Sequence, residues 1–314
     1  MFPQPRHVET NGIRLAVYEQ GDGPAVILLH GFPDLAFSWR HQLPALAAAG
    51  FRAVAPDLRG YGLSDVPPNI SDYHADVLLG DITGLLDALG LDTATIIGHD
   101  WGALLAWRMA QRHPARVGRL ISLNIPHFPR GERDPIDVMR ERLGDDFYIV
   151  NFQDSDEADR VFAEDTARFF DRMMRRSQVT RQQFDTLPPS MKSLSLLKVV
   201  TRNDASGVPL LTDAERDYYA QAFDRTGFTG AINWYRNWSA NWRSLEGVDD
   251  VIRVPALFIG AADDVVISPQ QIEAMKPLVP DLEIHMIERC GHWSQQEHPD
   301  TVNRIVLDWL ELRA

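Results

Sequence analysis

The pattern of hydrophobic and polar positions divides the chain into three parts. In the first part, short apolar runs alternate with longer stretches of helical periodicity. Alternation of this kind is typical of the α/β class, in which a mostly parallel twisted sheet is covered by helices on both faces. The runs predict strands at 14–20, 25–29, 52–56, 93–97 and 117–123, and helices at 39–49, 75–89 and 101–113.

A second, helical pattern occupies residues 125–246. This stretch is rich in Arg, Asp, Met and aromatic residues and has few β-branched runs. We therefore expect one α/β core, formed by residues 1–124 and 247–314, with a helical cap inserted at 125–246. The later core elements are expected to be strands at 256–260 and 283–287 and helices after Pro269 and at 298–312.

The net charge excludes some classes of partner. The chain has 314 residues, 24% of them charged, and a formal net charge of −13. An acidic excess of this size argues against nucleic acid or an anionic membrane as a partner. One dense basic run lies among acidic residues and is expected to form a solvated helix face; its members are Arg172, Arg175, Arg176 and Arg181.

Composition also bears on compartment and cofactors. Cys290 is the single cysteine, which excludes an internal disulfide and fits a reducing compartment. No apolar run reaches membrane-spanning length and no signal pattern opens the chain, so a cytoplasmic protein is expected. The ten histidines lack zinc-like spacing, and residues 60–62 match only part of a dinucleotide fingerprint. Neither a metal nor a cofactor is expected.

Residues 96–102, Ile-Ile-Gly-His-Asp-Trp-Gly, have the pattern of a nucleophile elbow: an apolar strand, a tight turn flanked by glycines, and a helix. Such a turn presents its central side chain, here Asp100, above the edge of the sheet. A serine at this position attacks acyl carbon, whereas a carboxylate displaces a leaving group from saturated carbon and becomes an alkyl ester. Asp100 therefore predicts opening of epoxides or removal of halide. The alternative is an ordinary solvated aspartate in a strand-to-helix turn.

A base and its partner are expected at the same edge of the sheet. His292 follows the last predicted strand, behind a glycine, and a histidine there can activate water near neutral pH. Asp263 and Asp264 both follow the strand at 256–260, and either one can orient the imidazole. The chain order of nucleophile, acid and histidine is the order of an α/β-hydrolase.

Backbone N–H groups are expected to bind the oxyanion that forms when the ester is hydrolysed. One belongs to Trp101, directly after the nucleophile. The other belongs to Phe32, in the loop after the strand at 25–29, since Pro33 has no N–H. His30 and His99 adjoin these motifs and are expected to hydrogen-bond the loops rather than to act as bases.

These motifs resemble the α/β-hydrolase family and, within it, the epoxide hydrolases. The resemblance implies the α/β-hydrolase fold, with no cofactor. It favours Asp264 over Asp263, because the residues from Asp264 to Pro269 match the family's spacing better. It covers nearly the whole chain and rests on His-Gly-Phe-Pro at 30–33, on residues 57–65, on the Asp100 elbow and on Gly-His-Trp-Ser-Gln at 291–295.

The insertion resembles the cap of an epoxide hydrolase, which grips the epoxide oxygen with two tyrosines. Asn-Trp-Tyr-Arg-Asn at 233–237 implies Tyr235 as one of them, and the stretch 147–153 implies Tyr148 as the other. Tyrosine is a donor at neutral pH, which an alkoxide leaving group needs. Tryptophans that recur at helical spacing are expected mainly to pack: Trp234, Trp238 and Trp242. The expected substrate-binding positions are Trp234, Pro33 and Trp293.

The sequence thus predicts an epoxide hydrolase whose partners are a small-molecule epoxide and water. Haloalkane and haloacid dehalogenases are the alternative, because they use the same Asp-His-Asp machinery and the Trp101 indole can donate to halide. Haloalkane dehalogenases, however, usually carry asparagine where Phe32 stands, and fluoroacetate dehalogenases carry arginine where Trp101 stands. A non-catalytic relative that only binds a ligand is a third hypothesis. A homodimer is left open.

Overall fold

Eight strands form one sheet in the order β1-β2-β4-β3-β5-β6-β9-β10. β1 and β2 pair antiparallel with their neighbours, and the strands from β4 to β10 pair in parallel. The structure, a computed structural model, describes residues 2–188, 192 and 194–313, and it confirms the α/β class. The strands are β1 (Arg6–Thr10), β2 (Ile13–Gln20), β3 (Ala25–Leu29), β4 (Arg52–Pro56), β5 (Ala94–His99), β6 (Val117–Leu123), β9 (Ala256–Ala261) and β10 (Leu282–Ile287).

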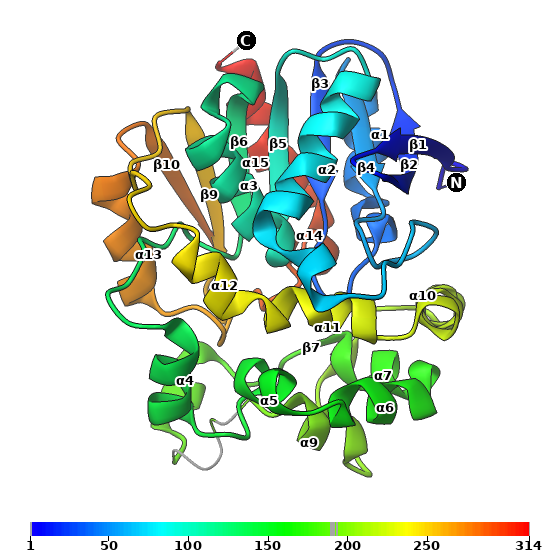
Figure 1. The fold of residues 1–314 in the computed structure, drawn as a ribbon, viewed down its shortest axis with the longest axis vertical. Helices are drawn as coiled ribbons and strands as arrows, with labels where there is room; N and C mark the ends of the chain where they lie inside the picture. The colour runs from blue at the N-terminus through cyan, green and yellow to red at the C-terminus, as the bar shows by residue number, and fades with distance from the viewer. Residues whose placement is uncertain (1, 189–191, 193, 314) are drawn as a thin grey trace.

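Helices cover both faces of this sheet, as Figure 1 shows. Successive side chains of a strand enter two separate cores: Ile96 of β5 belongs to the cluster under α2 and α3, and Ile97 to the cluster under α1 and α15. Burial on both faces explains the near-continuous apolar runs of the sequence. The helices of the core are α1 (Gln42–Ala48), α2 (Ala75–Ala88), α3 (Trp101–Arg112), α13 (Pro269–Met275), α14 (Ser294–Glu297) and α15 (Pro299–Glu311).

The segment between β6 and β9 is mainly helical and lies at the end of the sheet where β5 meets α3 (Figure 1). Its interior is packed with aromatic rings, among them Phe162, Phe169 and Phe228. In the described part of the chain we find no helix whose length and apolar content would let it traverse a bilayer. The elements of this segment are α4 (Pro135–Leu143), α5 (Tyr148–Asp154), α6 (Glu157–Glu164), α7 (Thr166–Met173), β7 (Arg175–Arg176), α8 (Arg181–Thr186), α9 (Leu196–Thr201), β8 (Val208–Pro209), α10 (Asp213–Thr226), α11 (Thr229–Arg236) and α12 (Trp238–Arg243).

Some element boundaries differ from the predictions. The predicted strands do not include β1, because its mixed polar sequence has few apolar residues. The single helix predicted at 39–49 is wrong at its start, since a 3-10 turn at Ala36–Trp39 precedes α1. The spacing of Trp234 and Trp238 suggests one helix, but α11 ends before Asn237 and α12 begins after it.

The expectation of a solvated basic helix face is also wrong. Arg175 and Arg176 form β7, and the side chains of Arg172 and Arg175 are only 15% and 13% exposed. Their guanidinium groups donate to the carbonyl oxygens of Asn203 and Ser206, each 31 residues further along the chain. Local sequence does not reveal acceptors at that separation.

Candidate active site

The turn between β5 and α3 has the geometry of the predicted elbow. Asp100 stands at its apex with φ 53° and ψ −119°, a conformation that costs a non-glycine residue on the order of 1–3 kcal/mol. A side chain at Gly98 would approach the carbonyl oxygen of Gly102 to 2.2 Å, and one at Gly102 would approach that of Leu29 to 2.0 Å. Both positions therefore require glycine, and this close packing holds Asp100 where β5 ends.

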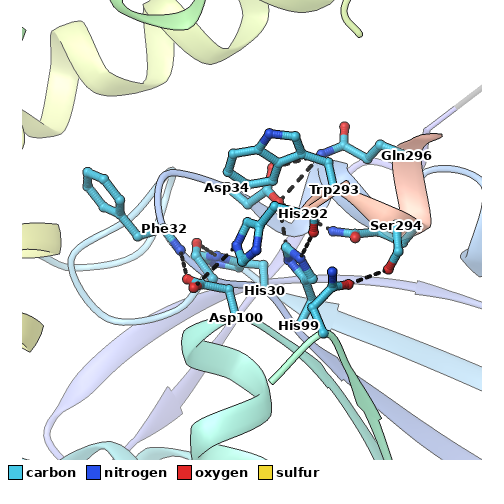
Figure 2. Close-up of polar contacts among 12 residues, drawn as sticks. His30, Phe32, Asp34, His99, Asp100, His292, Trp293, Ser294 and Gln296 are labelled. Atoms are coloured by element: carbon cyan, nitrogen blue, oxygen red, sulfur yellow. Dashed lines mark hydrogen bonds and ion pairs between the residues drawn. The ribbon is translucent and has the colours of Figure 1, made fainter. Parts of the chain in front are cut away.

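The carboxylate of Asp100 is held on one side by a backbone donor. The peptide N–H of Phe32 donates to Oδ1 at 2.8 Å, and a side chain at Gly31 would lie only 2.3 Å from that oxygen. The other oxygen, Oδ2, lies 3.5 Å from Nε2 of His292 (Figure 2). The expected nucleophile and the expected base therefore face each other, and only one carboxylate oxygen is tied to the backbone.

Asp264 holds His292 from its other side. Nδ1 of His292 lies 3.0 Å from Oδ2 of Asp264, whose side chain is 3% exposed. The peptide N–H of Val266 donates to Oδ1 of Asp264 at 2.9 Å. Asp263 instead accepts a hydrogen bond from the peptide N–H of Arg181 at 3.0 Å. The geometry therefore favours Asp264 as the partner of the histidine.

Asp100, His292 and Asp264 form a row of contacting side chains, and Asn124 is a further member that sequence reasoning missed. It follows β6, next to β9 in the sheet, and has the left-handed φ of 66°. Its Nδ2 donates to Oδ2 of Asp264 at 2.8 Å and to the carbonyl oxygen of Gly291 at 3.2 Å. Its Oδ1 accepts from the hydroxyl of Ser294 at 2.6 Å. The available signal is a polar amide directly after a buried strand, a place where chemistry concentrates in open α/β sheets.

The charges of this row stabilise one another. Burial alone would raise the pKa of both carboxyls, but His292 outweighs burial and lowers the pKa of Asp100 and of Asp264. Burial also opposes the imidazolium, yet the two carboxylates hold the pKa of His292 well above its ordinary value. Before reaction we therefore expect an imidazolium between two carboxylates. Esterification of Asp100 would remove one negative charge and so lower the pKa of His292.

A second group of polar side chains, those of His99, Asp34 and Tyr219, adjoins His292. Nε2 of His99 lies 2.7 Å from the carbonyl oxygen of His292, so this nitrogen carries the proton and Nδ1 is an acceptor. Nδ1 lies 3.8 Å from Oδ2 of Asp34. Burial raises the pKa of Asp34 to about 7 and lowers that of His99 to about 4. A protonated Asp34 facing a neutral His99 fits both shifts. Tyr219 donates to Oδ1 of Asp34 at 2.8 Å.

Two tyrosines from the helical segment between β6 and β9 lie beside the expected nucleophile. The ring of Tyr235, from α11, packs edge-on against those of Phe32 and Trp101, with centroids 5.5 and 5.1 Å apart. The ring of Tyr148, from α5, lies 5.6 Å from that of Tyr235. Burial, followed by the charge of Asp100, raises the pKa of both hydroxyls. Both tyrosines are therefore protonated donors at neutral pH.

Hydrogen bonds fix the two tyrosine helices against each other. Nε2 of Gln153 donates to the carbonyl oxygen of Tyr235 at 2.9 Å. Nε of Arg236 donates to that of Phe152 at 3.1 Å, and its guanidinium pairs with the buried carboxylate of Asp159 at 2.7 Å. Phe152 and Gln153, which are adjacent in the chain, therefore join α5 to α11.

The other predicted positions adjoin this site. Trp101 is the first residue of α3, where peptide N–H groups have no partner within the helix. The indole N–H of Trp234 donates to the carbonyl oxygen of Arg59 at 3.1 Å, and the residue is 1% exposed, which fits the packing expected of it. The ring of Trp293 lies 5.0 Å from that of His292, and Pro33 is buried. Roles for Trp234, Trp293 and Pro33 in substrate binding stay predictions.

Two polar groups near the site have structural partners. Nδ1 of His30 bonds the carbonyl oxygen of Gly31 at 2.9 Å, and its Nε2 accepts from the peptide N–H of Leu58 at 3.0 Å, which is the loop-bonding role expected of it.

Cys290, Glu297 and His298 bring possible metal-ligand atoms within 4.8 Å of one another. Glu297, however, already accepts two peptide N–H groups and pairs with a guanidinium at 3.3 Å, which disfavours a cation.

Comparison with known proteins fits this geometry. A family model described as alpha/beta hydrolase fold matches residues 24–299, so the chain is an α/β-hydrolase. Epoxide hydrolase A of Mycobacterium tuberculosis is 39% identical over 98% of this chain and 97% of its own length. Bifunctional epoxide hydrolase 2 of Sus scrofa is 39% identical over 96% of this chain, which spans 54% of that relative. Within the α/β-hydrolases, the chain belongs to the epoxide hydrolase family.

Solved structures agree. The crystal structure of epoxide hydrolase A from Mycobacterium thermoresistibile superposes with a TM-score of 0.88 at 39% identity, covering 98% of each chain. An epoxide hydrolase from an endophytic Streptomyces superposes with a TM-score of 0.88 at 38% identity, covering 98% of this chain and 96% of that one. The α/β-hydrolase fold expected from the sequence is confirmed.

Proposed function

We propose that this chain hydrolyses epoxides to vicinal diols through an ester on Asp100. One observation carries the proposal: an aspartate stands at the elbow, with two protonated tyrosines beside it and a histidine 3.5 Å from its Oδ2. A carboxylate nucleophile suits saturated carbon, and an epoxide needs a donor at its oxygen. The curated relatives named epoxide hydrolase support the same conclusion.

In the first step, Oδ2 of Asp100 attacks an epoxide carbon. The carbon–oxygen bond breaks and its electron pair goes to the epoxide oxygen, which receives hydrogen bonds from Tyr235 and Tyr148 and then a proton from one of them. The tyrosinate left behind is reprotonated by the proton that His292 releases once Asp100 is esterified. The peptide N–H of Phe32 keeps Oδ1 in place, so Oδ2 is the oxygen that is left to react. General-acid help of this kind is typically worth about 10²–10⁴ in rate.

In the second step, water attacks the carbonyl carbon of the ester. His292 takes a proton from the water, and Asp264 orients the ring and stabilises its charged form. The N–H groups of Phe32 and Trp101 bind the oxyanion. Collapse of this intermediate breaks the ester carbon–oxygen bond, and the imidazolium gives its proton to the leaving oxygen of the diol. Asp100, left as a carboxylic acid, then passes its proton to the imidazole, which regenerates the carboxylate and the imidazolium. Loss of the Asp100 charge in the first step prepares His292 for this one, because it lowers the pKa of the imidazole.

Several further features belong to the proposal. We place the helical cap at residues 125–246, with the core formed by 1–124 and 247–314. The acid in the Asp-His-Asp triad is Asp264. The lone, buried thiol of Cys290 supports the cytoplasm as its compartment. The dehalogenase alternative is disfavoured by the two tyrosine donors, since halide leaves without a proton.

A two-substrate assay tests the activity. We expect the protein to convert styrene oxide to its diol and to release no chloride from 1-chlorohexane, and we expect Asp100→Asn to lose the diol activity. Release of chloride without diol formation would assign the site to dehalogenation. No turnover of either compound or of other epoxides by the folded protein would leave only a binding role.

A further inference from the structure

His292 and Asp264 stand on two loops of the core, one after β10 and one after β9. The helical segment between β6 and β9 reaches both loops through one stretch of chain, residues 175–186, which begins with β7 and ends with α8. We call this stretch the β7–α8 segment. It contacts the histidine loop and α14 behind it through Arg176, and the aspartate loop through Arg181.

Glu297, at the end of α14, holds the backbone on both sides of the histidine. Its Oε2 accepts the peptide N–H of Gly291 at 3.0 Å, and its Oε1 accepts that of Trp293 at 3.2 Å. The side chain is 1% exposed, and a side chain at Gly291 would lie only 2.9 Å from Oε1. Both oxygens of one carboxylate therefore fix the two peptide groups that flank His292.

The charge that compensates this buried carboxylate comes from the β7–α8 segment. Nε of Arg176 lies 3.3 Å from Oε2 of Glu297, and Nη2 donates to the carbonyl oxygen of Glu297 at 2.7 Å. A buried carboxylate is costly unless a cation or hydrogen-bond donors compensate it. The backbone of Arg176 is itself fixed, because β7 pairs with β8 at Val208. The support of the histidine loop therefore extends into the inserted segment.

Arg181 holds the other loop. Its Nη1 donates to the carbonyl oxygens of Ile267 at 2.6 Å and of Asp264 at 3.3 Å. Its peptide N–H donates to Oδ1 of Asp263 at 3.0 Å. Asp185, one helical turn further on, accepts from Nε at 2.9 Å and orients the guanidinium. One residue of α8 thus fixes the backbone that carries the acid of the proposed triad.

Two other arginines of the inserted segment make contacts of the same kind elsewhere. Arg225 donates to the carbonyl oxygen of Gly62 at 2.9 and 3.2 Å, and that glycine belongs to neither loop. Arg175, the neighbour of Arg176, donates to the carbonyl oxygens of Ser206 and Gly207 at 2.9 and 3.0 Å, within the inserted segment. Both serve as matched controls.

We propose that the β7–α8 segment positions the base and its acid for hydrolysis of the ester. Arg176 acts through Glu297 on the backbone of His292, and Arg181 acts through backbone carbonyl oxygens on the loop of Asp264. The inference rests on the proposed function, because it assigns both arginines to the second step of that mechanism. Neither arginine touches the reacting atoms, so both are positioning residues.

The two steps depend differently on these loops. Asp100 is fixed by the strained elbow and by the peptide N–H of Phe32, which lies on a different loop. Ester formation should therefore tolerate a small displacement of the histidine. Ester hydrolysis needs the imidazole aimed at a water molecule, and a misplacement of about 1 Å can cost about 10²-fold in rate. Loss of either arginine should slow the second step selectively.

Single-turnover kinetics with styrene oxide test this selectivity. Arg176→Gln and Arg181→Gln should each slow ester hydrolysis by about 10- to 100-fold and leave ester formation near the wild-type rate, so that the ester accumulates. The side chain of Arg176 is 43% exposed, so its replacement should leave the fold intact. Arg176→Lys keeps the charge and should restore part of the rate. Arg175→Gln and Arg225→Gln should keep the wild-type ratio of the two rates.

A double variant tests whether Arg176 acts through Glu297. Glu297→Gln replaces one acceptor oxygen by an NH₂ group that would face a peptide N–H, and it should slow ester hydrolysis at least as much as Arg176→Gln. If both belong to one arrangement, the double variant should be no slower than Glu297→Gln alone. Slowing equal to the product of the two single effects would overturn the route through Glu297.

Hydrogen–deuterium exchange gives a measurement that does not depend on turnover. Arg176→Gln should speed exchange in the peptide 288–298, which contains the amides of Gly291 and Trp293, and should leave the peptides of β3 and β5 unchanged. Arg175→Gln should exchange like the wild-type protein. Unchanged exchange in Arg176→Gln would overturn the coupling between the β7–α8 segment and the histidine loop.

The kinetic and exchange measurements separate the inference from the proposed function. Failure of the wild-type protein to hydrolyse styrene oxide or other epoxides would refute the proposed function, whereas the exchange experiment would still decide the coupling. Turnover in which Arg176→Gln slows both steps equally, or neither, would refute the positioning role and leave the activity standing. Accumulated ester together with faster exchange in Arg176→Gln supports both.

Discussion

The peptide N–H of Phe32 donates to Oδ1 of Asp100 at 2.8 Å before any substrate is bound. In the proposed mechanism the same donor serves both steps. It first fixes the carboxylate so that Oδ2 faces the epoxide, and it later binds the oxyanion that forms on the ester of Asp100. A side chain at Gly31 would collide with this carboxylate oxygen, so the donor loop and the nucleophile depend on each other for their positions.

The tyrosine pair predicts a graded loss of activity. Tyr235→Phe and Tyr148→Phe should each lower the rate of ester formation with styrene oxide by about 10- to 100-fold, and the double variant should lower it further, because the alkoxide loses its donors. Stopped-flow tryptophan fluorescence can follow this step. Tyr218→Phe is the control, since its hydroxyl lies near that of Tyr18 at 3.4 Å, away from the site. Wild-type rates in the double variant would exclude tyrosine donation.

The charges of Asp100, His292 and Asp264 predict that ester formation and ester hydrolysis respond differently to pH. Asp100 has a lowered pKa and should stay ionised below the ordinary aspartate value of 3.8, so ester formation should hardly change from neutral pH to moderately acidic pH. Ester hydrolysis needs neutral His292 and should slow as the pH falls, because Asp264 still raises the pKa of the imidazole after Asp100 has lost its charge. Single-turnover assays across this range should therefore show more trapped ester at acidic pH. Parallel pH profiles for both steps would contradict this division of roles.

Asn124 is expected to act through Asp264. Asn124→Ala removes a 2.8 Å hydrogen bond to that carboxylate and should slow ester hydrolysis by about 10- to 100-fold, with little change in ester formation. Ser294→Ala removes only the outer bond to Asn124 and should have a smaller effect. Rapid-quench measurement of the trapped ester separates the two steps. An equal slowing of both would indicate a general structural disturbance instead.

Asp34 predicts an unusual pH dependence of stability. Its pKa is about 7 in the folded protein against 3.8 when unperturbed, so the folded state binds more protons between these values. The free energy of unfolding should therefore fall as the pH rises through this window, by on the order of 4 kcal/mol from this group. Asp34→Asn keeps the group neutral and should flatten the decline. Urea unfolding at pH 4.5 and at pH 8 measures this decline in the free energy of unfolding. An equal decline in the wild-type protein and in Asp34→Asn would reject the raised pKa of Asp34.

Much of the fold follows from short-range patterns. The apolar runs of β3 and β5 are buried on both faces, and Gly98 is required by its contact with the carbonyl oxygen of Gly102, which is close in the chain, whereas Gly102 is required by the distant carbonyl oxygen of Leu29. Those signals predict the sheet, the elbow and the identity of Asp100. The ends of the predicted strands then suggest His292 and either Asp263 or Asp264, because parallel strands bring their ends to one edge, and the family resemblance favours Asp264.

Long-range packing accounts for what the sequence did not reveal. Asn124 contacts Asp264 across 140 residues, and Arg175 finds its carbonyl acceptor 31 residues away. The break between α11 and α12 likewise depends on Asn237, whose Nδ2 donates to the carbonyl oxygen of Ile70 across 167 residues.

The central claim is that Asp100 forms an ester with the substrate and that His292 activates the water which cleaves this ester. Intact-protein mass spectrometry of His292→Gln mixed with styrene oxide tests it most directly. We predict an adduct with the full mass of one epoxide, mapped to the peptide that contains Asp100 and absent when Asp100→Asn is added. A folded variant that gains no adduct, or one whose adduct persists without Asp100, would contradict the mechanism.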